Sequence, residues 1–143
     1  MDNQVRLSLH SIFMSTAKLF AERSTCTRKK VGAILVRDNR IISSGYVGSP
    51  PNQPHCIDVG CIMGNNGGCI RTIHAEANAI MFAAKNGIST NNTILYTTLS
   101  PCIDCAKMIV AAGIVEIVYD EQYRDASPLD FLISCGINIG RFD

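Results

Sequence analysis

The sequence lacks several features that define whole classes of protein. No apolar run approaches the length of a membrane-spanning helix, and residues 1–10 do not have the layout of a secretory signal peptide. Internal repeats and low-complexity segments are also missing. We therefore expect a cytoplasmic protein with no membrane partner.

An excess of charge is missing as well. The chain carries 13 Lys and Arg against 12 Asp and Glu, a formal net charge of +1. Near-neutral charge disfavours a large nucleic-acid footprint, so we expect a small substrate and no nucleic acid. The 143 residues suffice for one domain over 1–143. Because 47% of the residues are apolar, surplus apolar surface favours a homo-oligomer.

Cysteine is abundant, and two short motifs that contain histidine and cysteine indicate metal binding. Seven cysteines without a secretory signal favour reduced thiols and metal binding over disulfides. HAEANAI begins at His74, and SPCIDC contains Cys102 and Cys105. A catalytic zinc takes three N or S ligands and keeps a fourth position open for water. These three side chains supply such ligands, and Glu76 remains as a carboxylate beside the metal.

The local structure expected at these motifs is compatible with one ion. Cys102 and Cys105 are three residues apart and share one helix face. Ser100 and Pro101 predict the N-cap and first turn of that helix, where the helix dipole favours thiolate. His74 and Glu76 would diverge in mid-helix but can both face an ion at a helix entrance. A structural zinc site, with Glu76 as a helix-surface carboxylate, is the alternative.

Apolar periodicity and turn residues predict the elements of secondary structure. Strand–helix–strand alternation in the second half implies parallel pairing, and an initial hairpin makes the sheet mixed. We therefore expect a three-layer α/β/α domain. The expected elements are helices near 5–22, 72–86, 102–113 and 127–135, strands 31–36, 40–46, 93–98, 114–119 and 137–139, and a long loop over 47–70.

H-x-E followed by P-C-x-x-C is the signature of zinc nucleobase deaminases. From about residue 20 to Tyr123, the chain resembles the deoxycytidylate (dCMP) deaminase family, especially its small bacterial and viral members. The matching landmarks are Cys26-x-Arg28, VGAILV, NRIISSGY, Pro54-His55-Cys56, RTIHAEANAI and TLSPCIDCAKMI. The resemblance implies a cytidine-deaminase-like fold, zinc-dependent hydrolysis of dCMP to dUMP, and frequently a homohexamer regulated by dCTP and dTTP.

Two positions depart from the family pattern. Regulated members usually read G-Y-N-G after the second strand, whereas this chain has Val47 between Tyr46 and Gly48. Valine neither donates nor accepts a hydrogen bond, so whatever the amide contacted must be bound differently. Lys85 stands where relatives carry an arginine associated with effector response, and lysine lacks the planar fork that grips phosphate. These four residues are the effector-binding candidates.

The basic, hydroxyl-rich segment over residues 23–30 has the groups that a nucleotide phosphate needs. A solvated connector is the alternative for this segment. Asn78 lies on the helix face of His74 and is a candidate for the sugar, or for a hydrogen bond to backbone. Tyr123 is a candidate for stacking on cytosine, or for the core or an interface. The substrate-binding candidates are Ser24, Thr25, Arg28, Ala75, Asn78 and Tyr123.

Four further cysteines predict a second, structural zinc. Setting aside the two catalytic thiols and the isolated Cys135 leaves Cys26, Cys56, Cys61 and Cys69. Four thiolates make a closed tetrahedral site, and a metal would stabilise a loop with little apolar content. The alternatives are reduced thiols without metal, or His55 replacing one ligand.

The sequence thus predicts a zinc-dependent dCMP deaminase that supplies dTTP synthesis. A broader enzyme acting on dCTP as well as dCMP is the nearest rival. A catalytically silent, zinc-stabilised regulatory or assembly protein is a rival of another class, although it would not need Glu76. A base deaminase acting on RNA or DNA is a third, which the near-neutral charge disfavours.

Overall fold

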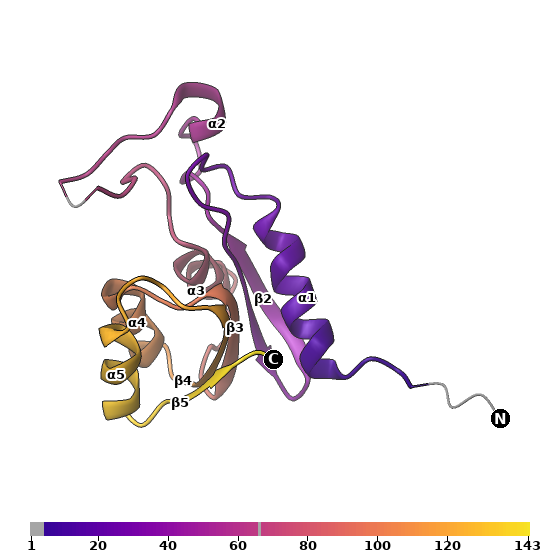
Figure 1. The fold of residues 1–143 in the computed structure, drawn as a ribbon. Helices are drawn as coiled ribbons and strands as arrows, with labels where there is room; N and C mark the ends of the chain where they lie inside the picture. Colours follow the sequence, from indigo (N-terminus) through magenta and orange to yellow (C-terminus); the bar gives the residue numbers. More distant parts are fainter. Residues whose placement is uncertain (1–4, 66) are drawn as a thin grey trace.

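The computed structural model describes residues 5–65 and 67–143 and consists of a mixed sheet between two layers of helices (Figure 1). The elements in chain order are α1 (Leu9–Ala21), β1 (Gly32–Arg37), β2 (Arg40–Tyr46), α2 (Cys56–Val59), α3 (Ala75–Lys85), β3 (Thr93–Leu99), α4 (Ile103–Ala111), β4 (Ile114–Glu121), α5 (Ser127–Ser134) and β5 (Asn138–Arg141). The expected α/β/α class is confirmed.

The sheet has the strand order β2-β1-β3-β4-β5. β1 pairs antiparallel with both β2 and β3, whereas β3–β4 and β4–β5 are parallel. The hairpin between β1 and β2 turns through Asp38 and Asn39, whose φ angles of 52° and 59° suit a two-residue turn with both central residues left-handed. The predicted hairpin and the predicted parallel second half are therefore both confirmed.

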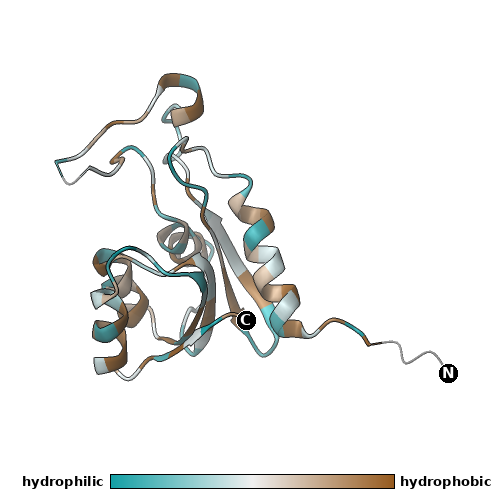
Figure 2. Ribbon diagram, in the orientation of Figure 1, coloured by the Kyte–Doolittle hydropathy of each residue, from teal (hydrophilic) through white to brown (hydrophobic). Residues whose placement is uncertain are grey.

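Each face of the sheet carries its own apolar cluster. On one face α1 packs Phe13, Met14 and Ala17 against side chains of β1, β3 and β4. Apolar and hydrophilic residues alternate along α1, as its amphipathic pattern requires (Figure 2). On the other face α3, α4 and α5 cover a larger cluster that includes Leu95 and Ile117.

Several expected boundaries are wrong. The first helix begins at Leu9, after the N-cap Ser8, whose hydroxyl accepts the N–H of Ser11. The third helix begins at Ala75, with His74 as its N-cap, instead of at residue 72. α4 has Cys102 as its N-cap instead of Ser100, because the Ser100 hydroxyl accepts the N–H of Tyr123.

The segment 47–70 was expected to be a loop without regular structure, and it is not wholly irregular. It contains the one-turn helix α2, and Met63 forms an antiparallel bridge with Cys69. Gly48 and Ile73 form a second bridge through two reciprocal backbone hydrogen bonds of 3.3 and 2.8 Å. The segment extends beyond the end of the sheet next to the C-terminal end of α1 (Figure 1). The two ends of the segment are therefore joined by the Gly48–Ile73 bridge, although most of the segment lies beyond the sheet.

Gly45 sets the distance between α3 and β2. A Cβ at this position would lie 2.3 Å from the Ala75 carbonyl oxygen and 2.6 Å from the Ala79 nitrogen. Only glycine therefore allows the first turn of α3 to lie directly on β2. This contact fixes the position of the helix start that carries His74.

Replacing Gly45 by alanine should therefore destabilise the fold. The added methyl group meets backbone, which cannot rotate away, so we expect a loss of about 1–3 kcal/mol in the free energy of unfolding. Urea denaturation measures it. Gly140→Ala is the matched control, because nothing lies within 4 Å of a Cβ there. Its effect should stay within about 0.5 kcal/mol, and equal losses in both variants would contradict the role of Gly45.

Candidate active site and second metal centre

The starts of α3 and α4 bring three metal-binding atoms together. His74 Nδ1 lies 3.5 Å from Cys102 Sγ and 3.4 Å from Cys105 Sγ. Tetrahedral zinc with bonds of about 2.0–2.1 Å to nitrogen and 2.3 Å to sulfur would separate such atoms by about 3.6 Å. The donor set and its spacing therefore fit zinc, with the imidazole and the two thiols as ligands.

Glu76 is the buried carboxylate of this site. It lies in the first turn of α3 and is only 4% exposed, although it is ionisable. Burial raises the pKa of Glu76, while its hydrogen bond with Cys105 and the nearby His74 act in the opposite direction. Since a buried carboxylate is costly unless it is paired, its place beside the thiols indicates a functional role instead of a helix-surface position.

The ligands also influence each other's protonation. The hydrogen bond from Cys105 lowers the pKa of Cys102 well below the usual range of a thiol, and the pKa of Cys105 is raised in turn. The hydrogen bond with Cys102 raises the pKa of His74, whereas the positive charge of Lys29 acts against it. One thiol of the pair is therefore disposed to ionise, and thiolate is the form that binds metal.

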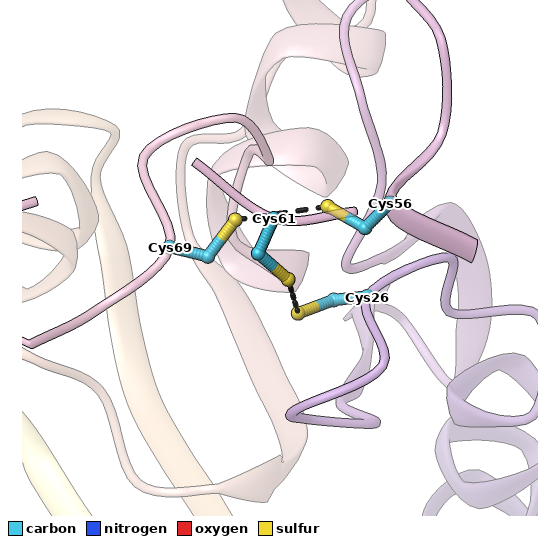
Figure 3. Close-up of side chains that lie close together, drawn as sticks. All are labelled: Cys26, Cys56, Cys61 and Cys69. Carbon is cyan, nitrogen blue, oxygen red and sulfur yellow. Dashed lines mark hydrogen bonds between the residues drawn. The ribbon is translucent and has the colours of Figure 1, made fainter. Parts of the chain in front are cut away.

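The remaining four predicted metal ligands form a second cluster (Figure 3). The Sγ atoms of Cys26 and Cys61 are 3.9 Å apart, and those of Cys56 and Cys69 are 3.6 Å apart. All four sulfurs lie within 4.8 Å of one another. Four thiolates at about 2.3 Å from a tetrahedral zinc would be about 3.8 Å apart, so this cluster also fits the metal.

His55 does not belong to this cluster. It is exposed and is the N-cap of α2, whereas the next residue, Cys56, is buried and directed toward the other sulfurs. Burial and the hydrogen bond with Cys69 raise the pKa of Cys56 to about 12. Burial also opposes ionisation of Cys69, but hydrogen bonds from the backbone of Arg71 and Ile62 lower its pKa to about 6. Within the described part of the chain, the set consists of the four cysteines.

The four-cysteine cluster joins the segment after α1 to the long loop. Cys26 Sγ accepts the N–H of Arg28, and Thr27 Oγ1 lies 3.7 Å from Cys61 Sγ. The N–H of Ile57 donates to the Thr25 carbonyl at 3.0 Å. The candidate phosphate segment is therefore attached at several points to residues 56–69.

The candidate substrate residues differ in what their side chains contact. The Ser24 hydroxyl closes its own loop, because it accepts the N–H of Val31 and donates to its carbonyl. Thr25 Oγ1 is buried and has no hydrogen-bond partner among the described residues. The exposed Arg28 donates to the Gly67 carbonyl at 3.4 Å. Of these, the Thr25 hydroxyl is the one whose hydrogen-bonding capacity the described residues leave unused, although its oxygen is buried.

Three more candidates lie around the metal ligands. Asn78 donates to the carbonyls of Tyr46, at 2.7 Å, and of Ile73, at 3.5 Å, as the backbone alternative anticipated. Ala75 directly follows His74 and is fully buried. Tyr123 is partly exposed, and Lys29 Nζ lies 4.3 Å from its ring centroid. No specific signal in the sequence pointed to Lys29, which is only one of several cations in the basic segment over residues 23–30.

The four effector candidates do not form one site within this chain. Tyr46, Val47 and Gly48 lie near the start of α3, since Gly48 pairs with Ile73. Lys85 ends α3, and 11 helical residues span about 16 Å. Val47 is 5% exposed and packs in the core. Its side chain therefore makes apolar contacts at the position where regulated members of the family usually carry an asparagine amide.

One histidine, one glutamate and two cysteines thus lie together as the H-x-E and P-C-x-x-C motifs of zinc nucleobase deaminases require. Residues 7–121 match the family model described as the cytidine and deoxycytidylate deaminase zinc-binding region. The chain belongs to the cytidine and deoxycytidylate deaminase family.

Individual relatives agree with this family. ComE operon protein 2 of Bacillus subtilis is 47% identical over 119 residues, which cover 83% of this chain and 62% of that protein. Deoxycytidylate deaminase of Saccharomyces cerevisiae is 37% identical, with 96% of this chain and 46% of that protein covered. The chain thus spans about half to three fifths of the length of these relatives.

A solved structure gives the same result for the fold. The dCMP deaminase of cyanophage S-TIM5, in complex with dCMP and dUMP, matches with a TM-score of 0.85 and 33% identity. The match covers 97% of this chain and 100% of that one. Among the described residues of the present chain, no helix has both the length and the apolar character needed to cross a membrane.

Metal analysis of the purified protein should find about two zinc ions per chain, because each cluster has a complete donor set. Changing Cys56 and Cys69 together to serine should lower the content to about one and destabilise the fold. Cys135→Ser is the matched control, since that exposed thiol lies in neither cluster. A fully loaded wild-type protein with a single zinc would exclude the second centre.

Proposed function

We propose that this chain is a zinc-dependent deoxycytidylate deaminase that converts dCMP and water to dUMP and ammonia, and so supplies dTTP synthesis. The observation that carries the proposal is the buried Glu76 beside the atoms of His74, Cys102 and Cys105. Proton transfer to the cytosine ring requires a carboxylate that is positioned beside the reacting groups, and the buried Glu76 is such a group. The structurally similar dCMP deaminase of cyanophage S-TIM5, in complex with dCMP and dUMP, supports the same chemistry.

Each residue then has a definite task. His74, Cys102 and Cys105 would hold a zinc ion, which would supply a water whose pKa is lowered toward about 7. Glu76 takes a proton from the water and delivers it to the ring nitrogen of cytosine. The water oxygen would bond to C4 of cytosine, and Glu76 would pass the remaining proton of that oxygen to the amine. The C4–N bond then breaks, ammonia leaves and the base becomes uracil. The burial that raises the pKa of Glu76 suits a group that must both accept and donate a proton.

The rival functions make less use of this geometry. A silent regulatory or assembly protein needs the metal ligands but has no use for a buried carboxylate against them. An enzyme of RNA or DNA bases needs a basic track, and the net charge is +1. Action on dCTP as well as dCMP differs only in how many phosphates are bound, so it is the nearest alternative.

We infer a homo-oligomer, a hexamer by family resemblance, that works in the cytoplasm. α3 exposes Met81 and Phe82 at 51% and 52%, beside an apolar groove of about 260 Å³ between α3 and α4. Apolar surface of this kind is typical of subunit contacts. Two clusters of free thiols suit a reducing compartment. Effector sites for dCTP and dTTP would then include groups from neighbouring subunits.

A panel of substrates tests the proposed activity. Uracil formation should be fastest with dCMP, slower with dCTP and CMP, and slowest with cytidine and a cytosine-containing oligonucleotide. Glu76→Gln is the control variant, because it keeps the shape of the site and its zinc but cannot shuttle protons. Its turnover should fall by about 10²–10⁴-fold or more with zinc content unchanged. Substantial turnover by this variant would refute the role of Glu76.

Regulation by dCTP and dTTP should be weak. An effector that relies on a hydrogen bond at position 47 has lost its partner, because Val47 is apolar and packed in the core. Rates measured against dCMP, with and without each triphosphate, should therefore shift little. A strongly sigmoidal curve abolished by dTTP would mean that other groups bind the effector.

A further inference from the structure

The sulfurs of the four-cysteine cluster lie in two close pairs, and the deamination mechanism uses neither pair. The Sγ atoms of Cys26 and Cys61 are 3.9 Å apart, and those of Cys56 and Cys69 are 3.6 Å apart. The two pairs share no sulfur (Figure 3). The four thiols can therefore combine two by two with none left over.

Each pair combines one accessible thiol with one buried thiol. Cys26 and Cys56 are 5% and 2% exposed, whereas Cys61 and Cys69 are half-buried. Redox-sensing cysteines are typically accessible to solvent and lie next to a second thiol that resolves the first oxidation product. Each pair has this composition, with Cys61 and Cys69 as the accessible members.

Positive charge lies beside both accessible thiols. The Arg71 Nε–H donates to the carbonyl of Gly60, the residue before Cys61, at 3.1 Å. The Arg28 guanidinium donates at 3.4 Å to the carbonyl of Gly67, two residues before the other accessible cysteine. Reactive cysteines occupy partly exposed, electropositive surroundings of this kind, whereas cysteines buried among apolar groups are inert.

The chain around the cluster can adjust to disulfide geometry. A disulfide has an S–S distance of about 2.05 Å, so the sulfurs of each pair must approach by about 1.5–1.9 Å. Three of the four cysteines belong to the loop over residues 47–70, which lies beyond the end of the sheet and exposes apolar side chains such as Ile57 and Val59. Few packed contacts therefore resist a shift of the loop. Cys105 differs, because it is 1% exposed and belongs to α4, which covers the main core.

We propose that the four-cysteine cluster is a site of reversible thiol oxidation, at which a hydroperoxide produces the disulfides Cys26–Cys61 and Cys56–Cys69. Disulfides that form in a reducing compartment are usually transient and redox-sensing. The inference goes beyond the proposed deaminase activity and does not depend on it, because no catalytic residue takes part.

Hydrogen peroxide, the simplest hydroperoxide, accounts for the atoms and electrons of each disulfide. The sulfur of the accessible Cys61 or Cys69 attacks one peroxide oxygen, so that an S–O bond forms and the O–O bond breaks. Hydroxide leaves and takes up a proton, from the thiol or from solvent, as water. The sulfur of the buried partner then attacks the oxidised sulfur, so that the S–S bond forms and the S–O bond breaks, and a second water leaves. Each pair thus gives two electrons to one peroxide.

The oxidised cluster loses its metal-binding capacity but keeps the same segments joined. Disulfide sulfurs lack the thiolate charge that binds zinc. The bond between Cys26 and Cys61 would join the segment after α1 to the loop, and the bond between Cys56 and Cys69 would close the loop on itself. Both cross-links restrict the unfolded chain, so the loop would remain folded without metal. A thiol reductant would restore the four thiols by exchange.

Treatment of the zinc-loaded protein with about two equivalents of hydrogen peroxide per chain tests the proposal. Cys135→Ser serves as the background, because the exposed Cys135 lies in neither cluster and would otherwise cross-link separate molecules. Peptide mass spectrometry locates the disulfides, and a thiol reagent counts the free thiols in denaturant. Zinc content and circular dichroism are measured before and after oxidation. Cys61→Ser in the same background is the matched variant, since it removes the accessible thiol of one pair only.

We expect the four thiols of the cluster to be lost and the two proposed disulfides to appear. The catalytic thiols should stay free, and about one zinc ion per chain should remain. Circular dichroism should change little, and dithiothreitol should restore all the thiols. In Cys61→Ser, the disulfide between Cys56 and Cys69 should still form, and Cys26 should stay reduced.

Other outcomes would overturn the proposal. Four thiols that survive the treatment, or sulfinic acids in place of disulfides, would mean that the cluster is not a reversible oxidation site. Disulfides that pair the four sulfurs differently would refute the assignment of accessible and resolving thiols. A disulfide between Cys102 and Cys105 alone would place the sensitive thiols at the catalytic site. Disulfide mapping in the Cys135→Ser background decides the matter even if Cys61→Ser does not fold.

Discussion

Two helix starts, 28 residues apart in the sequence, must be held so that a histidine nitrogen and two sulfurs lie within 3.4–3.5 Å. The tolerance is small, because a tetrahedral metal accepts little variation in the positions of its ligands. On the α3 side, Gly45 lets the helix lie directly on β2, and the reciprocal hydrogen bonds between Gly48 and Ile73 fix the residue before His74. On the α4 side, the end of β3 delivers Cys102 to its position.

The site places two ionisable groups, Glu76 and Cys105, in buried positions, whereas His74 is exposed and Cys102 is half-buried. Glu76 is buried, and the two thiols share a hydrogen bond that favours ionisation of Cys102. Such an assembly is costly in free energy unless opposite charge compensates it, and a divalent cation provides that charge. We infer that the zinc-loaded state is much more stable than the metal-free one. The groups that make the site unstable without metal are the groups that its chemistry requires.

The four-cysteine cluster also depends on metal binding, and it would stabilise the loop over residues 47–70. The loop over residues 47–70 exposes Ile57, Val59, Ile62 and Met63, so apolar burial contributes little to its stability. Four sulfurs drawn from the segment after α1 and from this loop compensate, since a metal among them would replace the missing core. Because Cys26 lies between Thr25 and Arg28, this cluster also restrains the segment that is the candidate for phosphate binding. The conformations of the loop and of the segment after α1 are thereby coupled.

The sequence by itself determined the elements and the ligand sets. Periodicity and turn residues identified every major helix and strand and the mixed sheet, and the spacing of His74, Glu76, Cys102 and Cys105 was enough to suggest their shared site. Elimination grouped the four remaining cysteines, because few residue types bind zinc. Such features are local, or depend only on residue type, so a linear pattern carries them.

Only the tertiary structure decided how side chains with several possible partners are used. Ser100 was expected to cap α4, but a neighbour 23 residues away takes its hydroxyl. The amide of Asn78 binds backbone carbonyls, and Lys29 rather than Arg28 lies over Tyr123. Each of these contacts joins segments distant in the sequence. The free energy of a hydrogen bond or cation–π contact depends on which groups the fold brings within a few ångströms, and no local pattern records that distance.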